Sequence, residues 1–190
     1  MKYSIIYADP PWSYSDDRHH KPWYLGITYD TMTTQDICDL PIKDIADKDC
    51  MLFMWTTMPM IPEALKVMKA WGFKYKTCAF AWEKLNQRLL TPAYLMGRYT
   101  MGSIELCLLG TRGRPKRIKN NVKQLVKAPR RGHSRKPDEV RERIVELCGD
   151  KPRVELFARD CAPGWVCIGN GIDGRDIRDV LKGETDDGTN

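Results

Sequence analysis

A short apolar run that stops at two consecutive prolines constrains this chain more than any other feature. Residues 3–8 have the aromatic and β-branched content of a buried strand. Pro10 and Pro11 must end that strand because each fixes φ and lacks a backbone N–H, so the carbonyls of Asp9 and Pro10 are expected to face a ligand. A carboxylate, a carbonyl and the Trp12 indole at one strand end suit a planar base that carries an exocyclic amine. A plain turn with an aromatic side chain packed beside it explains the same residues.

The rest of the chain predicts one α/β domain. Its 190 residues suffice for a buried sheet, and no repeat or linker divides them. We predict a domain over residues 1–181, with a basic insertion at about 110–136 and a polar, frayed tail over 182–190. Apolar runs predict further strands at residues 50–55, 73–82, 104–109, 153–159 and 165–168. Capping residues and apolar periodicity predict helices at about residues 33–40, 62–71 and 137–148, with long loops at 13–31 and 84–102.

The segment Asp9-Pro10-Pro11-Trp12 resembles the catalytic motif of the MT-A70-like adenine N6-methyltransferases, in their compact prokaryotic or phage form. Further segments agree with that family in the same order, and the resemblance covers roughly residues 5–174. They are Leu40-Pro41-Ile42, Leu52-Phe53-Met54-Trp55, Trp71-Gly72-Phe73, Glu105-Leu106-Cys107-Leu108, Ser134-Arg135-Lys136-Pro137-Asp138-Glu139, Glu155-Leu156-Phe157-Ala158-Arg159 and Gly169-Asn170. The resemblance implies a Rossmann-like, three-layer methyltransferase fold with permuted, β-class motif order. The catalytic loop then comes first and the cofactor loops lie near the C-terminus.

The resemblance also implies roles for individual residues. Asp9, Pro10, Pro11 and Trp12 would form the catalytic loop, where Asp9 and the Pro10 carbonyl hold the target amine and Trp12 stacks on the base. The cofactor, S-adenosylmethionine, would contact Asp9, Lys136, Arg159, Asn170 and Gly171. Lys136 would hold its carboxylate, and Arg159 and Asn170 its ribose. Trp23, Tyr24 and Glu105 would contact the target base. A solvated side chain is the alternative for Glu105, because a glutamate at a strand end is more often solvated.

Lys136 has a physical reason to attract a carboxylate as well. It immediately precedes the helix that Pro137 is expected to open, so its ammonium group and the positive end of the helix dipole act together. A surface lysine at a helix start explains the same position without a ligand.

Positive charge is concentrated in one segment. Residues 110–136 carry eleven Lys and Arg residues and no acidic residue, and subtracting these from the net charge of +6 leaves about −5 for the remainder. This pattern predicts a polyanionic partner, with Lys127, Arg130 and Arg131 contacting phosphates. A solvated loop that maintains solubility is the alternative.

Composition argues against several other classes of site and location. The odd number of cysteines, seven, includes no C-x-x-C pair and fits neither a disulfide framework nor a zinc ribbon. Adjacent histidines at 19 and 20 rarely ligate one ion, so no metal is expected. No apolar run is long enough to cross a bilayer and no leader precedes the first strand, which predicts a soluble, cytoplasmic protein.

Three functional alternatives remain open at this stage. The preferred hypothesis is an adenine methyltransferase acting on DNA, because the chain lacks the Cys/His spacing of an appended RNA-binding zinc module. RNA as the substrate and a non-catalytic nucleic-acid-binding subunit are the alternatives, and either a homodimer or a partner subunit is compatible with the sequence. Residues 169–174 also match the dinucleotide pattern G-x-G-x-x-G, but no second strand or acidic residue follows at the required distance. A dehydrogenase is therefore disfavoured.

Overall fold

The computed structural model describes residues 1–14, 31–97, 99–132 and 135–186. Its strands are β1 (Tyr3–Ala8), β2 (Ala46–Thr56), β3 (Lys74–Leu85), β4 (Leu95–Met96), β5 (Met101–Gly102), β6 (Ile104–Arg112), β7 (Leu125–Pro129), β8 (Arg153–Leu156) and β9 (Val166–Ile168). Its helices are α1 (Thr34–Cys38), α2 (Ile42–Ile45), α3 (Ile61–Ala70), α4 (Asp138–Cys148), α5 (Asn170–Asp173) and α6 (Ile177–Asp186), with a 3-10 turn, η3 (Met58–Met60). The strands and helices predicted above are confirmed, with shifted ends.

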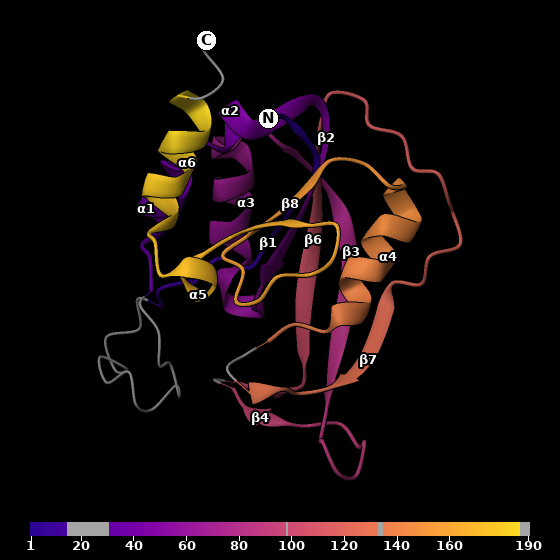
Figure 1. Ribbon diagram of the computed structural model, residues 1–190. Coiled ribbons are helices and arrows are strands. Elements are labelled where there is room, and N and C mark those ends of the chain that lie inside the picture. The colour runs from indigo at the N-terminus through magenta and orange to yellow at the C-terminus, as the bar shows by residue number, and fades with distance from the viewer. Residues whose placement is uncertain (15–30, 98, 133–134, 187–190) are drawn as a thin grey trace.

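The main sheet has seven strands in the order β7-β3-β6-β2-β1-β8-β9. Strand β1 is parallel to β2 and to β8, and β8 is parallel to β9, whereas β6 is antiparallel to both of its neighbours. Parallel strands with helices on both faces define the α/β class. Figure 1 shows α1, α3 and α6 on one side of this sheet and α4 on the other, so the three-layer prediction is confirmed.

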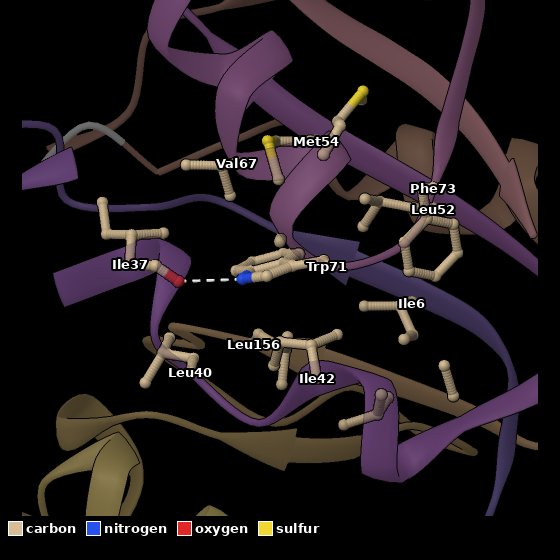
Figure 2. Packing of buried hydrophobic residues seen from close by; sticks show 14 of the residues in the cluster. Ile6, Ile37, Leu40, Ile42, Leu52, Met54, Val67, Trp71, Phe73 and Leu156 are labelled. Carbon is tan, nitrogen blue, oxygen red and sulfur yellow. Dashed lines mark hydrogen bonds between the residues drawn. The ribbon is translucent and has the colours of Figure 1, made fainter. Parts of the chain in front are cut away.

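Alternate residues of β1 divide the core between the two faces. Ile6 and Ala8 join the cluster under α1, α2, α3 and α6, whereas Ile5 and Tyr7 join the cluster under α4. Figure 2 shows the first cluster, in which the Trp71 indole N–H donates a hydrogen bond of 2.8 Å to the Ile37 carbonyl. A large aromatic ring is buried there without leaving its polar N–H unpaired.

Local sequence signals account for where the helices begin and end. Helix α1 begins after Thr33, whose hydroxyl accepts from the Asp36 N–H in a reciprocal capping box. Helix α4 follows Pro137 and ends at Gly149, whose φ of 86° is available to glycine at little cost. The start of α4 matters for function because it fixes the position of Lys136.

Two expected boundaries are wrong. The basic segment is not a plain insertion, because its apolar Leu125 and Val126 begin β7, which pairs with β3, and Val126 is fully buried. The polar tail is not frayed from Lys182, because α6 continues through Asp186 and is anchored by the buried Leu181. In the basic segment the apolar Val126 joins the core, whereas residues 182–186 continue a helix that the preceding Leu181 anchors.

The long loop expected at residues 84–102 also contains some regular structure. Strands β4 and β5 form a small antiparallel sheet of their own in this segment. In the part of the chain described here, no helix is both long enough and apolar enough to span a bilayer.

Candidate active site

One edge of the sheet gathers the residues that the sequence singled out. Asp9 follows the C-terminal end of β1, and the neighbouring β8 ends at Leu156, which pairs with Ala8. Strand β6 runs the opposite way, so its first residues, including Glu105, lie at this same edge. The edge formed by the carboxyl ends of parallel strands is where α/β proteins place their ligands.

Lys136 connects two carboxylates at this edge. Its Nζ lies 2.8 Å from Asp9 Oδ2 and 3.3 Å from Glu105 Oε2, and 5.7 Å from the centre of the Trp55 ring. The three charged side chains are largely shielded from solvent. Lys136 does bind carboxylates, as expected, but they are the protein's own Asp9 and Glu105. Its contact with a cofactor remains a prediction.

Lys84 completes this cluster, although no sequence pattern singled it out. Its ammonium group is ion-paired with Glu105, and it also lies 5.5 Å from the centre of the Trp82 ring. Glu105 is therefore buried between two lysines, and the alternative of a solvated strand-end glutamate is wrong. We refer to Asp9, Lys136, Glu105 and Lys84 as the lysine cluster.

Burial and charge act in opposite directions on the pKa values of this cluster. Burial raises the pKa of Asp9 above its ordinary value, and the neighbouring Lys136 ammonium only partly offsets that rise. Burial would also raise the pKa of Glu105, but Lys136 and Lys84 together hold that pKa below its usual value. The two carboxylates outweigh the burial of Lys136 and raise its pKa, so this lysine stays protonated.

Of the two carbonyls expected to face a ligand, those of Asp9 and Pro10, the Pro10 carbonyl also accepts a hydrogen bond within the chain. The Pro10 carbonyl accepts the Trp12 N–H at 2.9 Å, and the Pro11 carbonyl accepts the Met32 N–H at 2.9 Å. A carbonyl oxygen has two lone pairs, so Pro10 retains one acceptor site. The hydrogen bond from the Trp12 N–H closes the turn that follows Asp9.

Trp12 does not offer an open ring for stacking. It is only 6% exposed, and its indole N–H donates to the Trp55 carbonyl at 3.1 Å. The indole belongs to the core cluster under α3, where it anchors the catalytic loop to β2. The predicted stacking role is therefore wrong for this conformation, because a buried ring cannot receive a base.

Arg159 follows the end of β8, and Asn170 and Gly171 follow the end of β9. The fold packs these two segments against each other. A Cβ on Gly171 would lie 2.8 Å from the Arg159 Cα, closer than side chains tolerate, so this close approach requires glycine. Phe157 has φ of 62°, and such strained backbone is often found beside functional sites. Asp9, Lys136 and Arg159 line one narrow cavity of about 20 Å³. The other residues that line it are Tyr7, Arg135, Arg141, Glu155, Phe157 and Asp160.

The same segment disfavours the dinucleotide hypothesis. Gly169 follows β9, the outermost strand on that side of the sheet, and only α5 and α6 follow it among the described residues. A dinucleotide fingerprint requires a βαβ unit around its glycines.

Arg141 was not predicted, yet it organises a second ion cluster, in which Arg141 and Glu155 are largely buried and the other members are partly exposed. Its guanidinium binds Glu155 through two hydrogen bonds of 2.6 and 2.8 Å and also reaches Asp138 at 2.8 Å and Asp160 at 3.0 Å. Arg135 lies 2.5 Å from the other oxygen of Asp160. We refer to Arg141, Glu155, Asp138, Asp160 and Arg135 as the arginine cluster. A glutamate in the middle of a buried strand was the signal that such a cation must exist.

The predicted phosphate-contacting residues differ in their surroundings. Lys127 is exposed and lies 3.0 Å from Glu83, and Arg131 is ion-paired with Asp138. Arg130 makes no ion pair with any described residue, and its backbone N–H donates to the Leu85 carbonyl at 3.0 Å. Trp23 and Tyr24, predicted to contact the base, lie outside the described residues.

No group of three or more potential metal ligands occurs among the residues with described positions. The three histidines lie outside those residues, and so they leave the prediction of no metal untested.

Comparison with known proteins gives consistent matches. The MT-A70 family model matches residues 3–171. Type II methyltransferase M.MunI from Mycoplasma sp is 32% identical over 98% of this chain and 84% of its own length. The catalytic subunit METTL3 of the N(6)-adenosine-methyltransferase from Homo sapiens is 29% identical over 94% of this chain, and the Drosophila melanogaster MT-A70-like protein is 28% identical over 91%. The chain spans only 30% and 27% of the length of these two relatives.

Proposed function

The chain belongs to the MT-A70 family, and we propose that it transfers the methyl group of S-adenosylmethionine to the exocyclic amine of adenine in DNA, giving N6-methyladenine. One observation carries the proposal. The Asp9 carboxylate of the Asp-Pro-Pro-Trp segment projects from the ligand-binding edge of the sheet, 2.8 Å from a protonated lysine and beside the cavity lined by Arg159. This edge combines an acceptor for an amine with cations for an anionic ligand.

The residues around the narrow cavity suit the cofactor. Lys136 lies just before the N-terminus of α4, where its charge and the helix dipole favour a carboxylate. Arg159 and Asn170 can hydrogen-bond ribose hydroxyls, and the contact between Gly171 and Arg159 places them near each other. S-adenosylmethionine, when bound, supplies an electrophilic methyl group. Lys136 would exchange its contact with Asp9 for the ligand carboxylate, which leaves Asp9 to bind the substrate amine.

Asp9 would act by position and charge. The adenine amine is a weak nucleophile because its lone pair is delocalised into the ring. Hydrogen bonds from that amine to Asp9 and to the remaining acceptor site of Pro10 would hold the nitrogen nearer tetrahedral geometry and aim its lone pair at the methyl group. Preorganised acceptors of this kind contribute to rate without a covalent intermediate.

The relatives support DNA over RNA as the substrate. The similarity to M.MunI extends over most of both chains, whereas the N(6)-adenosine-methyltransferases match over less than a third of their own length. Those relatives nevertheless make RNA the second candidate substrate. The two substrates share the same adenine amine, so the chemistry at Asp9 is common to both.

One experiment tests the proposal and its alternatives together. The protein is incubated with methyl-labelled S-adenosylmethionine and, separately, with duplex DNA, single-stranded DNA or RNA of matched sequence, and the nucleosides are then analysed. We expect N6-methyldeoxyadenosine from DNA. Label in RNA adenosine alone would overturn the DNA assignment, and no label in any substrate would favour the non-catalytic subunit. If NAD but not S-adenosylmethionine raised the unfolding temperature, the dehydrogenase hypothesis would be supported instead.

A further inference from the structure

The segment that connects β3 to β6 exposes an unusual amount of apolar surface. Leu89, Leu90 and Met96 are 77%, 59% and 89% exposed, and Tyr94, Leu95 and Met101 are exposed as well. No acidic residue occurs between residues 86 and 104. An exposed apolar patch of this kind on a small domain marks an interaction site.

A groove of about 950 Å³ separates this segment from the turn that follows β7. Two hydrogen bonds join the segment to that turn, since the Gln87 side-chain amide donates to the Arg130 carbonyl at 2.8 Å and the Arg130 N–H donates to the Leu85 carbonyl at 3.0 Å. Figure 1 shows β4 and the end of β7 at the same end of the molecule. The groove is therefore built into the fold by backbone-directed hydrogen bonds.

The charges that line the groove are all positive. Arg88 and Arg130 both line it, and neither makes an ion pair with any residue of the described ranges. Lys84 and Arg131 also line it, but each has a carboxylate partner. Two guanidinium groups in one groove provide planar, multidentate donors of the kind that bind phosphate.

The inner wall of the groove leads to the catalytic loop. Lys84 is paired with Glu105, Glu105 with Lys136, and Lys136 with Asp9. A strand lying in the groove would therefore pass close to the carboxylate that we propose binds the target amine.

Leu89 and Leu90 lie on a closed turn beside the groove. The Asn86 N–H donates to the Thr91 carbonyl at 2.8 Å, and the Leu90 N–H donates to the Asn86 carbonyl at 3.1 Å. Leu90 has φ of 53°, a conformation that costs free energy for a side-chain-bearing residue. The turn thus presents two large apolar side chains to solvent at a conformational cost.

We propose that this groove binds the backbone of the duplex DNA strand that carries the target adenine, and that Leu89 and Leu90 support the base stack from which that adenine is extruded. A phosphate would bind between Arg88 and Arg130. The inference rests on the proposed function, since a base inside a duplex must leave the stack to reach Asp9. Apolar side chains inserted beside a base step are a known means of offsetting the cost of unstacking.

The first test compares two forms of the same DNA. The variant carrying Leu89→Ser and Leu90→Ser is assayed on one plasmid DNA, either native or heat-denatured, with methyl-labelled S-adenosylmethionine. Both side chains are exposed, so the fold is expected to survive. We expect kcat/KM on native DNA to fall by about tenfold or more, while activity on denatured DNA, where no base must be extruded, changes little. Tyr75→Ser, an exposed site at the opposite edge of the sheet, is the matched control and should affect neither form.

The second test addresses the phosphate. Replacing Arg88 and Arg130 by Gln should weaken binding to both forms of DNA and flatten the dependence of affinity on salt. On duplex DNA the logarithmic slope should fall by roughly 0.9 for each phosphate that the variant no longer neutralises. An unchanged slope would overturn the phosphate site.

Other outcomes separate this inference from the proposed function. If the wild-type protein methylates DNA but the leucine variant loses equal activity on both forms, or none, the stacking role is wrong and the chemistry still holds. If the leucine variant changes the oligomeric state measured by light scattering, the apolar turn is a protein contact and the inference is overturned. If the wild-type protein methylates no nucleic acid, the proposed function itself fails.

Discussion

The lysine cluster and the arginine cluster lie side by side at one edge of the sheet, yet they differ in how they hold their charges. Lys136 is a compact point charge between Asp9 and Glu105, and neither contact fixes its direction. Arg141 instead donates two parallel hydrogen bonds to Glu155. It also contacts Asp138 and Asp160. A lysine can exchange one oxygen for another at small geometric cost, whereas a guanidinium fork cannot.

This difference indicates that the two clusters have different roles. The arginine cluster joins the first turn of α4 to the end of β8, and β8 pairs with β1, which carries Asp9. It is therefore expected to hold the start of α4, and with it Lys136, close to Asp9. Under the proposed function, Lys136 of the lysine cluster would exchange Asp9 for the carboxylate of the bound ligand. One cluster is expected to serve the chemistry and the other the architecture.

The largest expected effect is on the chemistry. Asp9→Ala should abolish methyl transfer while leaving the affinity for S-adenosylmethionine within about tenfold of wild type, because Asp9 mainly serves the target amine. Labelled methyl transfer and calorimetric binding of S-adenosylmethionine are the two measurements. Near-normal turnover would remove Asp9 from the chemistry, and a large loss of affinity would mean that Asp9 also holds the cofactor.

The next effect is on stability. Arg141→Met should lower the free energy of unfolding by about 3–5 kcal/mol, because it leaves the buried Glu155 carboxylate without its cation. Denaturant unfolding measures the loss. Adding Glu155→Gln to Arg141→Met should recover much of it, since the uncompensated charge is then gone.

An exposed ion pair provides the matched control for Arg141→Met. Lys66→Gln, which removes the cation of an exposed helical pair with Glu63, should leave the unfolding midpoint unchanged. If Arg141→Met unfolds at the wild-type denaturant concentration, the arginine cluster has no architectural role and the two clusters do not differ in function.

A smaller effect is expected for the cation that changes partners. Lys136→Ala should weaken S-adenosylmethionine binding by about 1.5–3 kcal/mol, the range of a charge-assisted hydrogen bond. Calorimetry of the variant against Lys119→Ala, an exposed lysine paired with Glu146, measures the difference. Equal affinities in the two variants would show that Lys136 serves only the ligand-free ion cluster.

The smallest effect concerns pH. Burial raises the pKa of Asp9 above the ordinary value of 3.8, and methyl transfer requires the carboxylate, so activity should fall as the pH drops through this raised pKa. In the ligand-free protein Lys136 is the main group that opposes this rise, so in Lys136→Met the acid limb of kcat/KM, which reports the free enzyme, should move to still higher pH. The pH profile of kcat/KM at subsaturating S-adenosylmethionine, taken for the wild type and for the variant, measures the two acid limbs. A limb that stays in place, or moves to lower pH, would mean that Asp9 does not control it.

The sequence predicted the parts of the site that depend on local patterns. An apolar run ended by two prolines placed Asp9 at the C-terminal end of a buried strand, and Pro137 placed Lys136 before a helix. Both rules act within a few residues, so they can be applied to sequence alone. Resemblance added Arg159, Asn170 and Gly171, which the fold brings together, and their contacts with a cofactor remain predictions.

The tertiary structure alone decided which charges meet and which rings are buried. Lys84, Glu105 and Lys136 are far apart along the chain, and only the antiparallel position of β6 brings Glu105 to the end of β1. Trp12 was expected to stack on a base because it lies beside Asp9 and the Pro10 carbonyl at a strand end, but its ring packs in the core under α3 and its N–H donates to the Trp55 carbonyl. Burial and ion pairing are long-range properties, set by the packing of distant elements. A local pattern cannot specify them, because it does not show which distant groups will share its surroundings.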